Sequence, residues 1–286
     1  MSTKVAVVTG GNKGIGFGIV KGLCEKFNGI VYLTARDVQR GENAVKELEK
    51  LGYKPKFHQL DINDTNSVDL FREYIQETYG GLDVLVNNAA IAFKHDSTAP
   101  FSEQAAETIR VNYFSLVRIC HAMFPILRPH ARVVNLSSSA GQLMRIPGAA
   151  LREKLGSPSL TEEELSTLMN DFVESAKNNR TEADGWGNSA YAVSKVGVSA
   201  LTFIQQRQFD TEVSQNGSPG IIVNAVHPGY VDTDMTSHKG DWTIAQGADA
   251  PLYLALLPVD NNEIKGSYVW KDRRVLDWKA PIVAQY

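Results

Sequence analysis

Short apolar runs alternate along the chain with longer segments in which apolar residues recur three and four positions apart. The short runs, rich in Val, Ile and Leu, predict buried strands, and the longer segments predict amphipathic helices. Strands that alternate with helices pair in parallel through right-handed crossovers, so the pattern predicts an α/β fold, a doubly wound, Rossmann-type parallel sheet with helices on both faces. The predicted strands span 4–9, 30–35, 56–60, 82–87, 132–137, 221–226 and 267–270, and the clearest helices span 38–51, 67–79 and 102–127.

Composition narrows the choice of domain number and partner. The 286 residues, 43% of them hydrophobic, suffice for one sizeable core, so we expect a single domain over residues 1–286. The formal net charge is −3 and the charges are interspersed, which gives no reason to expect nucleic acid as a partner. No apolar run approaches the roughly 18 residues of a membrane span, so we expect no membrane partner either. A small molecule is the expected partner.

The cysteines, the histidines and the N-terminus favour a cytoplasmic protein without a metal. Cys24 and Cys120 form no C-x-x-C pair and are expected to be free thiols in a reducing compartment. The histidines show no metal-ligand spacing. The first strand begins too close to the N-terminus to leave room for a secretory leader, so we predict a cytoplasmic location.

A glycine-rich turn follows the first predicted strand. Residues 9–16 read TGGNKGIG, with the spacing T-G-x-x-x-G-x-G, and the predicted helix 17–27 follows. Glycine allows positive φ and close backbone approach, while a helix N-terminus offers free N–H groups to a pyrophosphate. A P-loop is excluded because no Lys followed by Ser or Thr closes the run. The turn therefore predicts a dinucleotide-binding site.

The end of the second predicted strand indicates which dinucleotide binds. In this fold a carboxylate there bonds the 2′-hydroxyl of NAD, whereas an arginine accommodates the 2′-phosphate of NADP. Residues 33–36 read LTAR, so Arg36, together with Lys13, is expected to clamp a 2′-phosphate, which favours NADP or NADPH. The alternatives are that Asp37 bonds a ribose hydroxyl of NAD, or that both cations are ordinary surface charges.

Tyr191 and Lys195 lie four residues apart, a spacing that places two side chains on one face of a helix. A neighbouring ammonium favours the phenolate, so we predict a lowered pKa for Tyr191 and a role as a general acid. The spacing is weak by itself, because tyrosine and lysine also occur four apart on ordinary helices. It gains weight from the polar segments that follow two of the strands.

Those segments are Asn87-Asn-Ala-Ala90 and Asn135-Leu-Ser-Ser138, at the predicted carboxyl ends of strands, where open α/β sheets bind ligands. A hydroxyl there can donate a hydrogen bond to a substrate carbonyl as negative charge develops on its oxygen, and Ser138 is the candidate. The alternative is that this serine only caps the local backbone. No G-x-S-x-G motif supports a hydrolase.

With these motifs on one chain, the sequence resembles the short-chain dehydrogenases/reductases, and most closely the monomeric NADPH-dependent carbonyl reductases of animals. The resemblance covers nearly the whole chain. It includes LTARDVQR at 33–40, FHQLDI at 57–62, YGGLDVLVNNA at 79–89, TEEE at 161–164 and YLALLP at 253–258.

The resemblance implies NADPH-dependent reduction of quinones, aldehydes and ketones, with prostaglandins and glutathione-conjugated carbonyls as further candidate substrates. Tyr191 would be the proton donor, Lys195 its pKa modulator and a ribose contact, Ser138 the polarising hydroxyl and Asn112 the anchor of a water relay. The implied cofactor contacts are Gly10, Asn12, Lys13, Gly14, Ile15, Gly16, Arg36, Asp61, Ile62, Asn88, Tyr191, Lys195, Pro228, Gly229, Val231 and Thr233. The alternatives are an NADP-linked alcohol or hydroxyprostaglandin dehydrogenase and a non-catalytic NADPH-binding regulator.

An insertion separates Ser138 from Tyr191, which are 53 positions apart, much further than in many tetrameric members of the family. The inserted segment, about 142–187, contains a capping box at Thr161–Glu164 and then apolar residues at helical spacing. In the carbonyl reductases that the chain resembles, such a helix covers a face that relatives use to oligomerise. We therefore predict a monomer, the alternative being a surface lid without effect on assembly.

The chain also departs from the family pattern near the expected substrate pocket. Ala90 replaces a glycine, Val226 and His227 stand where the mammalian enzymes carry cysteines, and Tyr230 replaces a tryptophan. These differences leave the substrate range open. A histidine before Pro-Gly at a strand end is expected to be structural rather than catalytic. The expected substrate contacts are Ser138, Phe93, Lys94, Gln104 and Tyr230, of which 93, 94 and 104 match positions that contact glutathione conjugates in the family.

Overall fold

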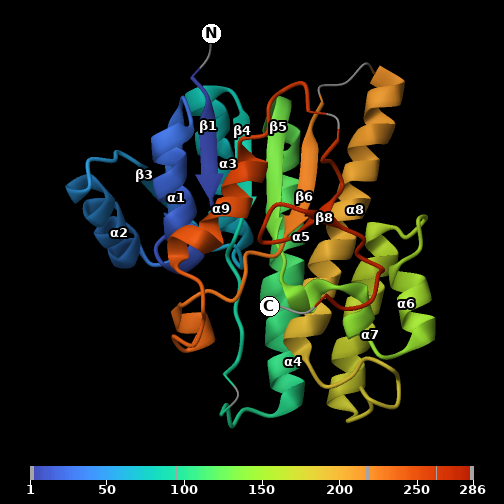
Figure 1. The fold of residues 1–286 in the computed structure, drawn as a ribbon. Coiled ribbons are helices and arrows are strands. Elements are labelled where there is room, and N and C mark those ends of the chain that lie inside the picture. Colours follow the sequence, from blue (N-terminus) through green and yellow to red (C-terminus); the bar gives the residue numbers. More distant parts are fainter. Residues whose placement is uncertain (1–2, 95, 217–219, 262, 284–286) are drawn as a thin grey trace.

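The computed structural model describes residues 3–94, 96–216, 220–261 and 263–283 and shows the predicted α/β architecture (Figure 1). The strands are β1 (Val5–Val8), β2 (Ile30–Ala35), β3 (Lys56–Gln59), β4 (Leu82–Asn87), β5 (Leu127–Leu136), β6 (Ile222–Val226), β7 (Tyr268–Val269) and β8 (Val275–Leu276). The helices are α1 (Gly14–Lys26), α2 (Val38–Lys50), α3 (Thr65–Tyr79), α4 (Phe101–Ile109), α5 (Ser115–Met123), α6 (Ala149–Leu155), α7 (Glu162–Lys177), α8 (Ala190–Asn216) and α9 (Ile244–Ala255).

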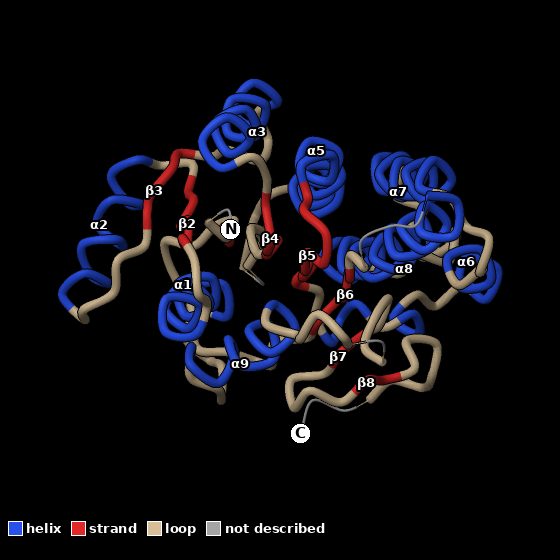
Figure 2. Tube along the Cα trace, turned by 90° about the horizontal axis from the view of Figure 1, so that it is seen from above, coloured by secondary structure: helices blue, strands red, loops and turns tan. Residues whose placement is uncertain are grey.

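The described strands form one sheet in the order β3-β2-β1-β4-β5-β6-β7-β8, parallel except for β8. Helices α3, α5 and α8 cover one face, and α1 and α9 cover the other (Figure 2). The central strand β1 is buried along its whole length, as expected for a parallel strand covered on both sides. Apolar clusters lie on both faces, one around Phe71 and Phe172 and the other around Leu23 and Leu252.

The register aligns the carboxyl ends of the central strands. Val8 on β1 pairs with Leu33 on β2 and with Val86 on β4. Asn87 on β4 pairs with Asn135 on β5. Because paired residues lie side by side, the segments that follow β1, β2, β4 and β5 all leave the sheet at the same side, the one formed by the carboxyl ends of the parallel strands (the carboxyl edge). This edge is where open α/β folds bind ligands, so it carries the candidate site.

The helix predicted over 102–127 is interrupted. Helices α4 and α5 are joined by a π-helical turn at Arg110–Phe114, and the helical segment ends in a 3₁₀ turn at Phe124–Ile126. Strand β5 accordingly begins at Leu127 rather than at Arg132. A π turn widens the backbone ladder locally and is frequent at functional sites, and this one contains Asn112.

The predicted parallel sheet is confirmed, and the structure adds one antiparallel strand at its last position, which the sequence did not predict. Strand β8 (Val275–Leu276) pairs with β7 in the antiparallel direction, with Tyr268 opposite Leu276. Only two residues of β7 are paired with β8, too few for the period-2 alternation that identifies a strand in sequence. Strand β8 was therefore not predicted from the sequence.

The segment 142–187 contains the predicted capped helix. Thr161 Oγ1 accepts from the Glu164 N–H, and the Glu164 carboxylate accepts from the Thr161 N–H, so the capping box begins α7 as predicted. The predicted apolar face is buried, namely Leu165, Leu168, Met169, Phe172 and Ala176. Helix α7 packs against α4 and α8. In the described part of the chain, no helix combines the length and apolarity needed to cross a membrane.

Candidate active site

The turn after β1 needs glycine at positions where a side chain would be strained or would not fit. Gly10 and Gly14 have φ of +64° and +56°, in the left-handed region. A Cβ on Gly16 would lie 2.5 Å from both the Gly10 carbonyl oxygen and Asn88 Nδ2. Among the described residues, no side chain caps the first N–H groups of α1. The turn is thus a narrow backbone cradle with free donors, which fits a pyrophosphate.

Asn88 fastens this turn to the end of β4. Its Nδ2 donates to the carbonyl oxygens of Thr9 and Gly10 at 2.9 and 3.1 Å. The backbone N–H groups of Asn88 and Ala89 donate to Thr9 Oγ1 at 3.0 and 3.1 Å. The Asn88 side chain therefore fixes the conformation of the glycine-rich turn by hydrogen bonds to its backbone carbonyl groups.

The two cations expected at the 2′-phosphate, Arg36 and Lys13, are both exposed, but only Lys13 forms an ion pair among the described residues. Arg36 is exposed directly after β2. Lys13 Nζ lies 2.7 Å from Asp234 Oδ2, and both side chains are about 60% exposed. An exposed ion pair contributes at most about 1 kcal/mol, so Lys13 can exchange Asp234 for a phosphate at little cost. Asp37, the residue on which an NAD site would depend, caps α2 instead, since its Oδ1 accepts from the Arg40 N–H at 2.9 Å.

The remaining predicted cofactor residues lie along the same edge. Asp61 and Ile62 follow β3; Ile62 is buried, and Asp61 Oδ1 accepts from the Asn63 N–H at 2.9 Å. Thr233 belongs to the segment after β6, and its Cγ2 would lie 3.3 Å from a Cβ on Gly14. The structure therefore brings the loops after β1 and β6 together. Positions Asn12, Ile15, Pro228, Gly229 and Val231 lie in these two loops or, for Ile15, at the start of α1.

Tyr191, Lys195 and Ser138 converge beside this cradle. Tyr191 and Lys195 stand on the first turns of α8, with Lys195 Nζ 5.8 Å from the centroid of the Tyr191 ring. Nζ donates to the Leu136 carbonyl oxygen at the end of β5 at 2.6 Å. Ser138 follows Leu136 by two residues, and its hydroxyl lies near enough to the Tyr191 side chain to lower the pKa of that phenol. The arrangement joins a phenol, a hydroxyl and an ammonium, which is a proton-donating site for an oxygen that gains negative charge.

The structure corrects the predicted pKa shift of Tyr191. Burial raises the pKa of Tyr191, and the nearby Ser138 hydroxyl lowers it by less. Burial also lowers the pKa of Lys195 to about 8. The predicted lowering of the tyrosine pKa by the ammonium is wrong for the chain alone, because Nζ donates to the Leu136 carbonyl and lies over the ring face.

The structure shows the capping role of Ser138, and this role is compatible with the predicted role toward a substrate. Its Oγ accepts from the Ala140 N–H at 3.2 Å, which is the local cap that the sequence left as an alternative. A serine oxygen has two lone pairs and one proton, so the same group can still donate to a substrate oxygen.

Asn112 lies in the π turn behind Lys195. Its Oδ1 accepts from the Ile91 N–H at 2.8 Å, and its Nδ2 donates to the Ile91 carbonyl and the Ser194 hydroxyl at 2.9 and 3.1 Å. Ser194 Oγ in turn donates to the Tyr191 carbonyl at 2.8 Å. A cavity of about 10 Å³, lined by Asn112 and Lys195 among others, adjoins these groups. That volume is about what one water molecule requires.

The expected substrate-side residues are more dispersed. Phe93 and Tyr230 are each 37% exposed. Gln104 on α4 donates to the Ala99 carbonyl oxygen at 2.8 Å, and Lys94 lies exposed beside Phe93. Within the described residues, the side chains at 93, 94 and 104 form no hydrogen bond with Ser138, Tyr191 or Lys195.

His227 is structural, as its sequence context predicts. Its Nδ1 accepts from the Ser139 N–H at 2.9 Å, so it links the end of β6 to the turn that carries Ser138. The imidazole is 2% exposed, and its ring centroid lies 4.3 Å from that of Trp270. Burial lowers the pKa of His227 to about 3, so the ring is neutral at physiological pH.

We expect His227 to make the protein sensitive to acid. The unfolded chain takes up a proton near pH 6.5, whereas the folded chain does so only near pH 3. Stability is therefore lost as pH falls from 6.5 toward 3, by about 1.4 kcal/mol per unit. Urea unfolding at pH 7 and pH 5 should show a loss of about 2 kcal/mol that His227→Gln abolishes. His238→Gln, at an exposed histidine, is the control, and equal losses in the two variants would contradict the assignment.

The sequence missed two residues that support the site. Tyr268 Oη donates to the Ser138 carbonyl oxygen at 2.5 Å, and Ser194 bridges Asn112 to the Tyr191 backbone. Ser194 was visible inside the Tyr191–Lys195 motif, but a serine on a helix gives no signal by itself. Tyr268 lies far away in sequence, so only the pairing of β6 with β7 places it here.

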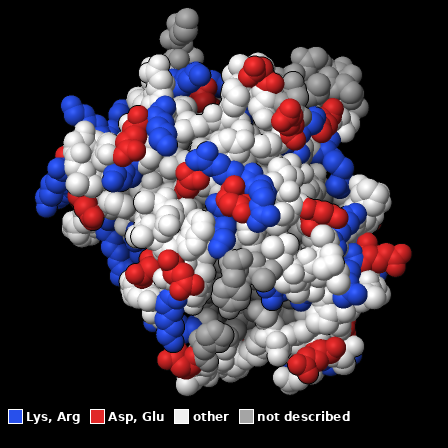
Figure 3. All heavy atoms as spheres, viewed as in Figure 1, with Lys and Arg blue, Asp and Glu red and all other residues white. Residues whose placement is uncertain are grey.

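The described residues form no patch of a single charge on the face of the molecule drawn in Figure 3. On the face drawn in Figure 3, basic and acidic side chains are interspersed and neither sign dominates. The local groups suited to an anionic cofactor are the N-terminus of α1, Lys13 and Arg36.

Comparison with known proteins agrees with this geometry. The family model for short chain dehydrogenases matches residues 4–151 and 179–244. The chain is 47% identical over 277 residues to carbonyl reductase 3 (NADPH) of Mus musculus, covering 96% of this chain and 99% of the relative. It is 45% identical over 275 residues to carbonyl reductase 1 (NADPH) of Homo sapiens, covering 96% and 98%.

Solved structures show the same fold. Salutaridine reductase from Papaver somniferum superposes with a TM-score of 0.82 at 32% identity, covering 93% of this chain and 99% of that one. An NADPH-bound carbonyl reductase from chicken fatty liver superposes with a TM-score of 0.67 at 23% identity, covering 97% and 100%. The second similarity is one of fold alone.

Proposed function

The chain belongs to the short-chain dehydrogenase/reductase family, and from this premise we propose that it is an NADPH-dependent reductase of carbonyl compounds. The observation that carries the proposal is the meeting of Ser138, Tyr191 and Lys195 beside a glycine cradle at the carboxyl edge of the sheet. The substrate class comprises quinones, aldehydes and ketones, with prostaglandins and glutathione-conjugated carbonyls as narrower candidates.

The cradle and its neighbours fit NADPH. The N-terminus of α1 with Gly10, Gly14 and Gly16 would hold the pyrophosphate, and Arg36 with Lys13 the 2′-phosphate. The other proposed contacts are Asn12, Ile15, Asp61, Ile62, Asn88, Pro228, Gly229, Val231 and Thr233, with Tyr191 and Lys195 at the nicotinamide ribose. When bound, this cofactor supplies a hydride to the carbonyl carbon.

The chain's own residues manage the charge and the proton. The Ser138 hydroxyl donates to the carbonyl oxygen and stabilises the negative charge that develops there. The Tyr191 hydroxyl gives its proton to that oxygen, which completes the alcohol. The Lys195 ammonium stabilises the phenolate that is left, and Asn112 anchors a water behind Lys195 through which the phenol regains its proton.

The test is consumption of NADPH with menadione and with an aromatic aldehyde, followed by loss of absorbance. Turnover with neither substrate, with tight NADPH binding retained, would favour a narrow substrate or the non-catalytic regulator over a broad reductase. Products identified as the hydroquinone and the alcohol would support the proposal.

We expect Arg36→Ala to reduce kcat/KM with NADPH about 10- to 100-fold and to leave the value with NADH nearly unchanged. The reason is that the guanidinium contacts only the 2′-phosphate, which NADH lacks. Parallel assays with the two cofactors measure the ratio, and Arg40→Ala on α2 is the matched control. Equal losses with both cofactors would place Arg36 elsewhere in the mechanism.

The segment about 142–187 is proposed as an insertion within one domain that keeps the chain monomeric. The support is its helix α7, which packs on α4 and α8, and the gap in the family match between residues 151 and 179. We further propose a cytoplasmic location, on the strength of the free thiols Cys24 and Cys120.

The substrate side of the site is proposed to include Tyr230, Phe93, Lys94 and Gln104 beside Ser138. Phe93 and Tyr230 offer partly exposed rings after β4 and β6, and Lys94 offers a cation suited to a carboxylate on a conjugated substrate. This arrangement supports glutathione conjugates as one substrate group.

A further inference from the structure

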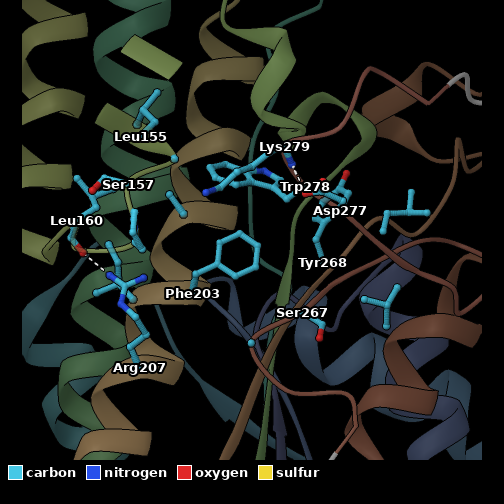
Figure 4. Close-up of a pocket in the computed structure, with 17 residues that line it drawn as sticks. Leu155, Ser157, Leu160, Phe203, Arg207, Ser267, Tyr268, Asp277, Trp278 and Lys279 are labelled. Carbon is cyan, nitrogen blue, oxygen red and sulfur yellow. Dashed lines mark hydrogen bonds between the residues drawn. The ribbon is translucent and has the colours of Figure 1, made fainter. Parts of the chain in front are cut away.

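A second pocket, of about 290 Å³, lies away from the glycine cradle (Figure 4). Its walls come from the middle of α8, from the connection between α6 and α7 at 155–160, and from the segment 266–279 that contains β7 and β8. None of the residues assigned above to the cofactor, the substrate or catalysis lines it. The pocket is therefore separate from the proposed active site.

Aromatic and aliphatic side chains form one wall of this pocket. Phe203 on α8 and Trp278 lie with ring centroids 5.1 Å apart at an angle of 53°. Leu160 and Leu276 also line the pocket, and Figure 4 shows Phe203 between Arg207 and Trp278. Such a wall suits a flat apolar group, because offset or tilted ring contacts add to the burial of apolar area.

Two cations line the same pocket. Arg207 is partly buried, and its Nη2 donates to the Leu160 carbonyl oxygen. Burial lowers the pKa of Arg207, and no carboxylate of the described residues forms an ion pair with it. Lys279 likewise has no ion pair with a described acid. The one acid of the lining, Asp277, accepts from the Lys279 backbone N–H at 2.9 Å, so one of its oxygens is turned to the chain itself.

We propose that this pocket is a second ligand site, for a small aromatic carboxylate. The ring system would lie against Phe203 and Trp278, and the carboxylate would be held by Arg207 and Lys279. A guanidinium that is partly removed from water without an ion-pair partner is stabilised by an anion, and Asp277 forms no such pair with Arg207.

The pocket walls also touch the proposed catalytic turn. Tyr268, which lines the pocket, donates through Oη to the Ser138 carbonyl oxygen at 2.5 Å. Trp278 donates through its ring Nε1 to the Gly141 carbonyl oxygen, and its backbone carbonyl accepts from the Leu143 N–H at 3.2 Å. A ligand that shifts either ring moves the turn that carries Ser138. Resting on the proposed function, we expect occupancy to lower kcat without raising KM for the carbonyl substrate.

The binding test uses 1-naphthaleneacetate and its uncharged analogue 1-naphthaleneacetamide, titrated by calorimetry into the full chain saturated with NADP⁺. We expect one site for the carboxylate and affinity at least about tenfold lower for the amide. Arg207→Gln and Lys279→Gln should each weaken the carboxylate about tenfold, and Arg207→Lys should restore most of the loss. Arg72→Gln, on the distant helix α3, is the matched control and should bind normally.

Equal affinity for acid and amide, or unchanged binding in Arg207→Gln, would overturn the site. Displacement of the probe by menadione would overturn its separation from the active site. Unchanged kcat at saturating probe would overturn the link to Ser138. Because calorimetry does not require turnover, these results on the site stand apart from any failure of the proposed reductase activity.

Discussion

Tyr191→Phe is expected to lower kcat/KM for carbonyl reduction by about 10³-fold, while the affinity for NADPH falls by only a few fold because the other proposed cofactor contacts remain. The substitution removes one oxygen and with it the proton that the new alcohol requires, and general acids contribute about 10²- to 10⁴-fold. The ring remains, so packing on the first turn of α8 and the contact with Lys195 are retained.

The measurement is NADPH oxidation with menadione under steady-state conditions, with cofactor affinity determined separately by fluorescence titration. Tyr113→Phe is the matched control, because this buried tyrosine bonds the Ser166 hydroxyl on α7 and lies outside the proposed mechanism. Turnover within a few fold of the parent would remove Tyr191 from the role of acid. A loss confined to NADPH binding would make it a cofactor contact only.

The sheet could be predicted because burial on both faces leaves a strong trace in sequence. β1 is a continuous apolar run and β4 is apolar except at Asp83 and Asn87, and their predicted positions agree with the structure within a residue or two. The strand β8 escaped because two paired residues produce no periodicity. The π turn at Arg110–Phe114 escaped because a change of helical ladder leaves the apolar spacing nearly unaltered.

The parts of the site that could be predicted are those in which a short sequence motif determines the local backbone arrangement by itself. The turn of Gly10, Gly14 and Gly16 and the four-residue spacing of Tyr191 and Lys195 describe local backbone arrangements. Asn112 is different, because its partners Ile91 and Ser194 lie 21 and 82 residues away, and family resemblance alone pointed to it.

Electrostatics was the least predictable property. The spacing of Tyr191 and Lys195 suggests that the ammonium points at the phenol. In the structure, Lys195 Nζ instead donates a hydrogen bond to the Leu136 carbonyl oxygen at 2.6 Å. Burial then dominates both groups, raising the pKa of Tyr191 and lowering that of Lys195 to about 8. The four-residue spacing of Tyr191 and Lys195 reveals neither how deeply the two side chains are buried nor that a backbone carbonyl of β5 accepts from Lys195.

Ser138→Ala is expected to lower kcat by about 10²- to 10³-fold, the usual loss when one donor to a developing oxyanion is removed. The hydroxyl also accepts from the Ala140 N–H, so the variant should lose about 1 kcal/mol of stability as a lost cap. These effects are separable, because that loss leaves a protein of ordinary stability almost fully folded and cannot reduce the rate a hundredfold.

Pre-steady-state turnover of a bound aldehyde, with urea unfolding in parallel, measures the rate and the stability of Ser138→Ala. Ser138→Thr retains a hydroxyl and should recover part of the rate, whereas it need not recover the stability. If the alanine variant loses stability but keeps its rate, Ser138 is a cap and the oxyanion is stabilised elsewhere. If both variants lose the rate equally, the position of the turn matters more than its hydroxyl, and the Tyr268 contact to the Ser138 carbonyl becomes the group to change next.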